Sequence, residues 1–301
     1  MVGTAQGARG VGFVRVLITG ASGQLGLDCV VAFADDEVVV ASRDRVDLTQ
    51  PSSVRSAVAG IRPDVVVNCA AYTAVDLAES DPETAFAVNA DGARAVALGC
   101  VDAGARMIHI STDYVYDGTQ LSPYVEGDAP NPLSVYGRSK LAGDLAVGEV
   151  LGDQQSTIVR TSWVCGAHGS NMVKTVLRLM ALDPQRTLTF VDDQFGHPTF
   201  TSGLAEKIRE LALAEVGGLI HVTHQGAVSW YEFVGEILEA AGYSSDQVQP
   251  ISTNDLTPAR PAVRPMNSVL ANARLSAMGM ALLPDFREVL PGVVRAIKSA
   301  T

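Results

Sequence analysis

The chain has 301 residues, of which 47% are hydrophobic and 18% are charged, so it can bury a core and is not expected to be disordered. The length suits one large domain or two closely joined ones. The net charge of −11 argues against general nucleic-acid binding, because an acidic surface repels phosphate, but it leaves room for a local basic pocket.

No uncharged apolar run reaches the roughly 18 residues of a membrane span, and residues 1–13 lack the form of a signal peptide. We therefore expect a flexible leader over 1–13, no membrane partner and a cytoplasmic protein. Cys29, Cys69, Cys100 and Cys165 form no CxxC pair, which favours buried free thiols. The five histidines have no zinc-like spacing, so no metal site is predicted.

Short apolar runs alternate with helical segments in the first half of the chain. The expected strands are 14–19, 37–41, 64–68, 106–111 and 157–161, and the expected helices are 24–34, 52–60, 82–104 and 136–148. Such alternation predicts an α/β fold, a Rossmann-type doubly wound parallel sheet with helices on both faces.

The alternation weakens after Trp163. The expected helices there are 171–182, 201–214, 230–242 and 286–298, and the expected strands are 187–191 and 219–223. We predict a dinucleotide-binding domain over 14–165, to which later segments near 187–223 return. Residues 166–301 are expected to form mainly a smaller α/β substrate-binding lobe.

Gly20, Gly23 and Gly26 follow the first strand directly, in the pattern GxxGxxG. A tight turn from strand to helix needs residues without Cβ, so that backbone amides and the helix N-terminus can approach a pyrophosphate. Its place at the first strand–helix junction favours dinucleotide binding over an ordinary tight turn.

The end of the second strand selects between cofactors. The residues there are Ala41, Ser42 and Arg43, followed by Asp44, so the acid that selects NADH is absent from the strand end. The Arg43 guanidinium suits a 2′-phosphate, although a solvated Arg43 beside Asp44 is the alternative. The sequence favours NADPH and leaves NADH open.

Tyr136 and Lys140 form a YxxxK motif, which places both side chains on one helix face. A nearby ammonium favours phenolate and so lowers the pKa of a tyrosine, making it a general acid or base. Thr112 and Asp113 follow the fourth strand, at the sheet edge where ligands bind, and a hydroxyl there can hold a substrate carbonyl.

The glycine loop, the hydroxyl after the fourth strand and YxxxK, in this order, resemble the extended short-chain dehydrogenase/reductase superfamily over nearly the whole chain. Further strings resemble its dTDP-4-dehydrorhamnose reductase family: 68–76 (NCAAYTAVD), 111–116 (STDYVY), 160–163 (RTSW), 193–199 (DQFGHPT) and 264–268 (RPMNS). That family reduces the 4-keto group of dTDP-6-deoxy-L-lyxo-4-hexulose to give dTDP-L-rhamnose.

The resemblance implies a role for each matching residue. Tyr136 is the proton donor, Lys140 binds cofactor and tunes Tyr136, Thr112 and Asp113 approach the sugar, and Trp163 packs on it. The cofactor residues implied by the loop and the resemblance are Gly20, Gly23, Gln24, Leu25, Gly26, Arg43, Asp47, Leu48, Ala70, Ala71, Tyr72, Tyr136 and Lys140. Cys69 and Tyr72 depart from the Ala and His more often expected in the first string.

Several alternatives stay open. Arg264 is either a surface turn residue or a partner for the nucleotide diphosphate. A nucleotide-sugar 4,6-dehydratase would place a second acid where Tyr114 stands, which counts against dehydration more than against epimerisation. A non-catalytic NADP-binding regulatory subunit is similar to this family, but Thr112 and the Tyr136–Lys140 pair favour an enzyme. The family's Mg-dependent dimerisation has no carboxylate cluster to support it, so monomer and homodimer both remain.

Overall fold

The structure is a computed structural model that describes residues 14–41, 43 and 45–299. The leader expected over 1–13, as well as Ser42 and Asp44, lies outside the described residues.

Six parallel strands form the central sheet, namely the five that are expected in the first half of the chain and one later strand. In chain order they are β1 (Arg15–Thr19), β2 (Glu37–Ala41), β3 (Val65–Asn68), β4 (Arg106–Thr112), β5 (Ser156–Thr161) and β10 (Gly218–His221). Their spatial order is β2-β1-β3-β4-β5-β10, so the direction of winding reverses between β1 and β3. Ligands of doubly wound sheets bind at the carboxyl ends of the strands beside such a reversal.

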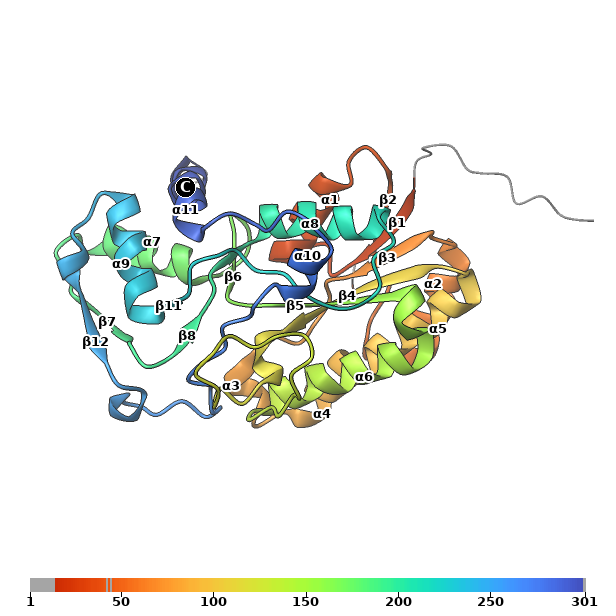
Figure 1. The fold of residues 1–301 in the computed structure, drawn as a ribbon, viewed down its shortest axis with the longest axis horizontal. Coiled ribbons are helices and arrows are strands. Elements are labelled where there is room, and N and C mark those ends of the chain that lie inside the picture. Colours follow the sequence, from red (N-terminus) through yellow and green to blue (C-terminus); the bar gives the residue numbers. More distant parts are fainter. Residues whose placement is uncertain (1–13, 42, 44, 300–301) are drawn as a thin grey trace, which may run out of the picture.

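Helices cover both faces of this sheet (Figure 1). One face packs against α1 (Gln24–Ala32) and α8 (Thr201–Leu213), and the other packs against α2 (Pro51–Ile61), α5 (Ala93–Ala103) and α6 (Val135–Gln155). Within β1, Val16 and Ile18 point into the first layer and Leu17 into the second. Burial on both faces explains why the strands read as unbroken apolar runs.

The single helix expected over 82–104 is instead three pieces. They are α4 (Pro82–Phe86), a π-helical turn (Ala87–Gly92) and α5, and the short α3 (Val75–Ala78) precedes them. At this turn α6 comes very close, since a Cβ on Gly143 would lie 2.1 Å from the carbonyl oxygen of Asn89. A π-helical turn of this kind often marks a functional site.

The remaining elements build the second lobe, with a few returns to the first. They are β6 (Val164–Cys165), α7 (Met172–Leu182), β7 (Leu188–Val191), β8 (Phe195–Gly196), β9 (Thr199–Phe200), β11 (Val228–Ser229), α9 (Trp230–Ala241), β12 (Val248–Ile251), α10 (Ala273–Ala277) and α11 (Phe286–Ser299). Helices α7, α9 and α11 share one apolar core, and Figure 1 shows this lobe beside the sheet.

The segments near 187–223, which are expected to return to the first domain, pack in two different places. Helix α8 packs on α1, and β10 pairs with β5 as the sixth strand. Strand β7, however, pairs with β12 and belongs to the second lobe. The return therefore begins near Thr201, because the apolar side chains of β7 are needed to cover α9.

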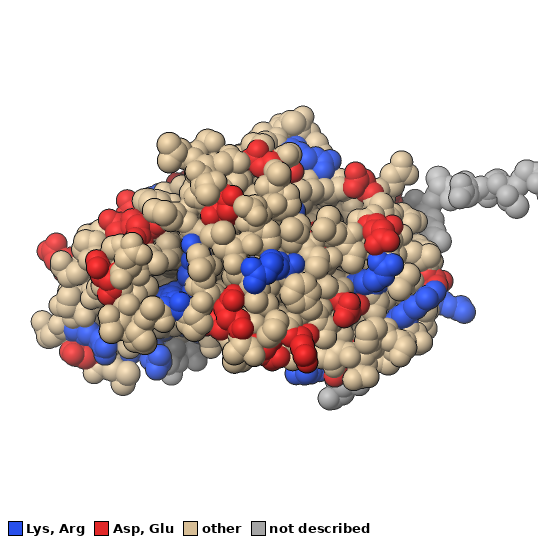
Figure 2. Space-filling view, turned by 90° about the horizontal axis from the view of Figure 1, so that it is seen from below, with Lys and Arg blue, Asp and Glu red and all other residues tan. Residues whose placement is uncertain are grey.

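The described residues include no helix that is long and apolar enough to cross a membrane, and no group of three potential metal ligands. Lys, Arg, Asp and Glu side chains are interspersed on the face seen in Figure 2. All four cysteines are free, but Cys69 is only half-buried and its Sγ lies 3.9 Å from that of Cys29.

Candidate active site

The glycine loop turns sharply between β1 and α1. Gly20 has φ +66°, and a Cβ there would lie 2.6 Å from the backbone nitrogen of Ala70 on the neighbouring β3 loop. Helix α1 begins after Gly23, which has no side chain to cap it. No side-chain oxygen therefore accepts a hydrogen bond from the first backbone amides of this helix. An anion at this N-terminus would take that place.

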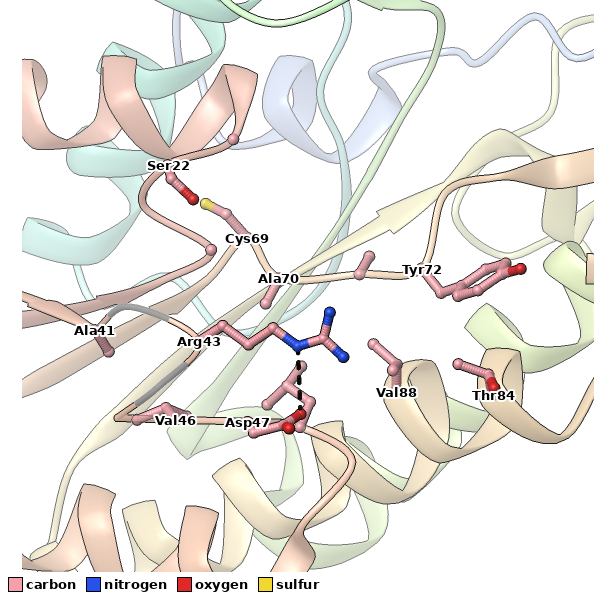
Figure 3. Close-up of a pocket in the computed structure, with 14 residues that line it drawn as sticks. Ser22, Ala41, Arg43, Val46, Asp47, Cys69, Ala70, Tyr72, Thr84 and Val88 are labelled. Carbon is pink, nitrogen blue, oxygen red and sulfur yellow. Dashed lines mark ion pairs between the residues drawn. The ribbon is translucent and has the colours of Figure 1, made fainter. Parts of the chain in front are cut away.

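A cavity of about 380 Å³ opens beside this loop at the reversal of strand order (Figure 3). Of the cofactor residues named from the sequence, those that line it are Gly20, Gly23, Arg43, Asp47, Leu48, Ala70, Ala71 and Tyr72. Gln24 instead reaches the second lobe, with its amide bonded to Ser170 and Asn171, and Leu25 is buried in the core.

Arg43 is the cation of this cavity. Its guanidinium points into the space between Ala70 and Val88 in Figure 3. Its Nε lies 3.8 Å from Asp47 Oδ1, and its side chain is 79% exposed, so only a loose ion pair restrains it. Thr49 donates two hydrogen bonds to Asp47, which lower the pKa of that carboxyl. The Arg43 guanidinium is thus free to donate hydrogen bonds to a phosphate.

The loop after β3 is held by Asn89, which the sequence analysis missed. Its Oδ1 accepts from the Tyr72 amide at 2.8 Å, and its Nδ2 donates to the Tyr72 carbonyl at 3.0 Å. The same Nδ2 donates to Ser139 Oγ of α6 at 2.9 Å. One buried amide in the π-helical turn therefore links the wall of the cavity to the helix that carries YxxxK. The nearest sequence signal is an asparagine inside an apolar helical run.

Tyr136 stands at the start of α6. Ser134 caps this helix by accepting from the Gly137 amide, and Gly137 packs so closely that a Cβ would lie 2.2 Å from the Tyr114 carbonyl oxygen. The Tyr136 ring contacts the Tyr114 ring edge to face. Thr112 is close enough to lower the pKa of the Tyr136 hydroxyl, so the two predicted catalytic hydroxyls belong to the same site.

Burial raises the pKa of Tyr136 above its usual value, with Asp113, Tyr114 and Asp144 adding to the rise and Thr112 opposing it. The expected lowering by Lys140 is therefore wrong for this structure, because desolvation of the phenolate is the largest effect and Lys140 is not among the groups that shift the pKa of Tyr136. A phenol with a raised pKa keeps its proton until a stronger base, such as an alkoxide, appears beside it.

Lys140 lies one turn further along α6 and is buried. Its Nζ donates to the carbonyl of Ile110 at 2.7 Å and lies 3.4 Å from His109 Nε2. Burial lowers the pKa of Lys140 to about 8, and the nearby Asp144 carboxylate works against this.

Asp113 is more enclosed than the sequence suggests. Thr112 Oγ1 donates to one of its carboxylate oxygens at 3.0 Å, and Ser162 Oγ donates to the other at 2.9 Å. Burial raises the pKa of Asp113 to about 6, although these hydroxyls and that of Ser268 oppose the rise. Asp113 thus ties the segment after β4 to the segment after β5.

Trp163 follows β5 with φ +43°, which is an outlier for a bulky side chain. Its indole stacks on that of Trp230 in α9, with the ring centroids 3.6 Å apart. Gly196 packs so closely that a Cβ on Gly196 would lie 2.5 Å from the Trp163 ring. Strained backbone persists where packing holds it, and it clusters at functional sites. The sequence analysis missed Trp230, which fixes the orientation of Trp163.

Arg264 lies in the irregular stretch that crosses from the second lobe to the first. Its guanidinium donates two hydrogen bonds to the Asp76 carboxylate of α3, at 2.8 and 2.6 Å. It also lines a second, largely apolar cavity of about 940 Å³ between residues 117–123 and 263–269. Arg264 is therefore not a surface turn residue, since its side chain is only 8% exposed.

Comparison with known proteins gives one consistent family. The model of the family described as RmlD substrate binding domain matches residues 14–299. A dTDP-4-dehydrorhamnose reductase of Streptomyces griseus is 43% identical over 283 residues, covering 92% of this chain and 91% of that protein. A dTDP-4-keto-6-deoxy-D-glucose reductase of Streptomyces niveus is 39% identical, covering 86% and 88%.

Solved structures also resemble this chain in fold. The dTDP-4-dehydrorhamnose reductase of Bacillus anthracis in complex with NADP superposes with a TM-score of 0.88 at 36% identity, covering 93% of this chain and 98% of that one. A dTDP-glucose 4,6-dehydratase of Streptomyces venezuelae, at 20% identity and a TM-score of 0.77, shares the fold.

Proposed function

The chain belongs to the RmlD substrate-binding-domain family, and from this premise we propose that it is an NADPH-dependent oxidoreductase of nucleotide-sugar metabolism. It reduces the 4-keto group of dTDP-4-dehydro-L-rhamnose (dTDP-6-deoxy-L-lyxo-4-hexulose) and gives dTDP-L-rhamnose. The observation that carries this function is the placement of Thr112 at the carboxyl end of β4 and of Tyr136 at the start of α6, at the same sheet edge as the glycine-loop cavity.

The residues around the smaller cavity fit an NADP cofactor. The uncapped N-terminus of α1 suits the pyrophosphate, the Arg43 fork suits the 2′-phosphate, and the apolar wall of Val46 and Leu48 suits the adenine. Lys140 and Tyr136, both in the first turns of α6, would bind the nicotinamide ribose. When bound, the reduced nicotinamide supplies the hydride that this reaction needs.

Tyr136 supplies the proton. Reduction of a carbonyl carbon leaves an alkoxide, which is a stronger base than a phenolate, so proton transfer from Tyr136 is downhill even with its raised pKa. Thr112, whose hydroxyl donates to Asp113 in this structure, can turn to donate to the same substrate oxygen and polarise the carbonyl beforehand. The buried ammonium of Lys140 then stabilises the phenolate until it regains a proton.

The substrate side is formed by residues of both lobes. Trp163 offers an indole surface for the apolar hydrogens and methyl group of a deoxysugar, and its support by Trp230 keeps that surface fixed. Asp113 orients the loop below the sugar. Arg264, on the wall of the larger cavity, has a cationic edge for the diphosphate in addition to its pair with Asp76.

The test is consumption of NADPH with the 4-keto sugar made from dTDP-glucose by a dehydratase and a 3,5-epimerase. We expect enzyme-dependent oxidation of NADPH and a product that NMR identifies as dTDP-L-rhamnose. Absence of turnover by a folded, NADPH-binding protein would contradict the function and favour a non-catalytic binding subunit. Light scattering of the same sample distinguishes a monomer from a homodimer.

A second substrate should be tested in the same assay, because the Streptomyces niveus relative is named as a reductase of dTDP-4-keto-6-deoxy-D-glucose. Omitting the epimerase leaves dTDP-4-keto-6-deoxy-D-glucose as the only keto substrate. Turnover that is faster without the epimerase than with it would assign the chain to that reaction instead.

A further inference from the structure

Two thiols meet at the inner wall of the glycine-loop cavity. Cys29 lies on α1 and is fully buried, whereas Cys69 follows β3, is half-buried and lines the cavity. Their sulfur atoms are 3.9 Å apart, which is within hydrogen-bonding distance for two thiols. The reduction proposed above uses neither thiol. The pair therefore joins a sulfur on the cavity wall to a sheltered sulfur behind it.

Both thiols are carried by well-anchored backbone. The Cys69 amide donates to the Thr19 carbonyl at 3.2 Å, which extends the pairing of β3 with β1 by one residue. Cys29 belongs to the apolar layer that packs α1 on the sheet. The two sulfurs are thus held in contact, and a disulfide needs them to approach from 3.9 Å to about 2.05 Å.

The two sulfurs differ in how they can react. The hydrogen bond to Cys69, together with burial, raises the pKa of the Cys29 thiol, so Cys29 keeps its proton. Buried protonated thiols do not react with oxidants in solution, whereas an accessible thiol with a second thiol beside it is typical of redox-reactive cysteines. Cys69 is therefore the sulfur that a solute in the cavity meets first, and Cys29 is its partner.

The other two cysteines are internal controls. Cys100 lies in the apolar layer beneath α2, α5 and α6, and Cys165 lies in the core of the second lobe. Burial raises the pKa of each of these thiols to about 12. An oxidant in solution should therefore leave both of them unmodified while the protein is folded.

A bound dinucleotide would cover Cys69. Ser22 and Gly23 lead into the uncapped N-terminus of α1, which is the site proposed above for the pyrophosphate, and they line the same cavity as Cys69. In Figure 3 the Ser22 hydroxyl and the Cys69 sulfur point toward each other. A pyrophosphate at this N-terminus would lie between solvent and the Cys69 sulfur.

We propose that Cys69 and Cys29 form an oxidation site for a hydroperoxide, which is open when the glycine-loop cavity is empty and closed when a dinucleotide fills it. The closing of the site rests on the cofactor position proposed above. The oxidation of the two thiols does not.

The reaction has two steps. The Cys69 sulfur attacks the O–O bond of the hydroperoxide, so that an S–O bond forms, the O–O bond breaks, and the leaving oxygen takes the thiol proton and departs as water or an alcohol. The Cys29 sulfur then attacks the sulfenic acid, so that an S–S bond forms, the S–O bond breaks, and water leaves with the Cys29 proton. The two thiols lose a pair of electrons, which reduces the hydroperoxide.

The first test treats the cofactor-free protein with hydrogen peroxide and maps its peptides by mass spectrometry without reductant. We expect a linked pair of peptides that joins Cys29 to Cys69 with the loss of two hydrogen atoms, and we expect dithiothreitol to separate them. Cys69→Ala should abolish the link. Cys29→Ala should leave a sulfenic acid on Cys69 that dimedone traps. Cys100→Ala is the matched control, because it removes another buried thiol and should leave the link unchanged.

The second test repeats the oxidation with NADP⁺, which fills the site without reducing the oxidant. At about ten times its Kd, roughly one protein molecule in eleven is free of NADP⁺, so the rate of linkage should fall about tenfold. Titration of NADP⁺ by the quenching of tryptophan fluorescence supplies the Kd beforehand.

The proposal is overturned if excess peroxide produces no link between Cys29 and Cys69, or if Cys69 accumulates as sulfinic acid in its place. It is also overturned if the link forms at the same rate with and without NADP⁺ in a protein that binds NADP⁺. The link in the cofactor-free protein requires neither the sugar nor turnover. A protein that forms the link but does not bind NADP⁺ therefore contradicts the function proposed above and not the thiol pair.

Discussion

At the scale of single residues, the hydroxyl of Tyr136 is the group on which the chemistry depends. Its ring contacts that of Tyr114 edge to face at the start of α6, so the phenol is positioned before any substrate arrives. Preorganised groups of this kind lose little entropy when the reaction begins. The raised pKa suits a donor in the direction of reduction.

Tyr136→Phe keeps the ring and its contact with Tyr114 and removes only the proton donor. We expect kcat for the 4-keto sugar to fall by about 10²–10⁴, as for loss of a general acid, while the Kd for NADPH stays near that of the parent. Stopped-flow absorbance at 340 nm and fluorescence titration measure the two quantities. Turnover within a fewfold of the parent would transfer the role of acid to Asp113 or to a water molecule.

Arg43 is the residue that should separate the two nicotinamide cofactors. Arg43→Ala should weaken NADPH about ten- to hundredfold, the value of a lost charge-assisted hydrogen bond of about 1.5–3 kcal/mol, and leave NADH nearly unchanged. Only NADPH carries the 2′-phosphate. The measurement is fluorescence titration of each cofactor in low salt, and equal losses for both would remove Arg43 from the phosphate site.

At the scale of elements, the alternation of apolar strands and helices was enough to predict the sheet, because strands such as Val65–Asn68 are buried on both faces. The two-residue strands β6 and β9 carry no period and could not be found. The π-helical turn was hidden for another reason, since Asn89 and Gly92 continue an ordinary helical pattern and only the close packing of Gly143 reveals the extra residue.

In the candidate site, too, the residues that belong to a sequence pattern could be predicted and the others could not. Residues attached to a motif, such as Thr112, Tyr136 and Lys140, were found because the motif fixes their place at the ends of β4 and the start of α6. Asn89 and Asp144 were missed because their partners are distant in sequence, on the Tyr72 loop and on β5. No spacing rule on one chain segment predicts such pairs.

The strand–turn–helix unit of the glycine loop gives the prediction at this scale. Gly23→Val puts a branched side chain at the start of α1, where its Cβ would lie 3.2 Å from the Gly20 carbonyl oxygen. Its methyl groups would extend into the site that we propose for the pyrophosphate. NADPH affinity should fall at least tenfold. The free energy of unfolding should fall by less than about 1 kcal/mol, because φ at Gly23 is negative and a residue with a side chain can adopt it.

Titration of NADPH together with a thermal melt tests this expectation. Gly60→Val in α2 is the matched control, because a Cβ there meets no atom within 4 Å and the site is remote from the cavity. Cofactor affinity that is unchanged in Gly23→Val would mean that the pyrophosphate binds elsewhere.

At the scale of the whole molecule, the two lobes are joined by an ion pair across 188 positions of sequence. Arg264 binds both oxygens of Asp76, and the Ala262 amide donates to the same carboxylate at 3.2 Å. The hydrogen bonds of Arg264 lower the pKa of Asp76 below its ordinary value of 3.8. The pair fixes the irregular stretch against the sheet edge, beside the larger cavity.

Asp76→Asn removes the charge and leaves the buried Arg264 guanidinium unpaired. We expect the free energy of unfolding at pH 7 to fall by about 1–2 kcal/mol, which is reduced from the full value of a buried pair because the Asp76 side chain is 42% exposed. The KM for the 4-keto sugar should rise, since the wall of the larger cavity loses its anchor, while the Kd for NADPH should not change.

The pH dependence gives this prediction a sign. Because folding lowers the pKa of Asp76, its contribution is complete above the ordinary value of 3.8 and is lost as the pH falls through the lowered value. Denaturation curves of the parent and Asp76→Asn should therefore differ most near neutral pH and converge in acid. Asp102→Asn is the matched control, because its pair with Arg55 joins α2 to α5 within one lobe and is more exposed. That control should destabilise the protein less than Asp76→Asn does and should leave KM unchanged. If Asp76→Asn behaves as the control does, the contact between Asp76 and Arg264 does not hold the lobes, and other packing at the sheet edge must.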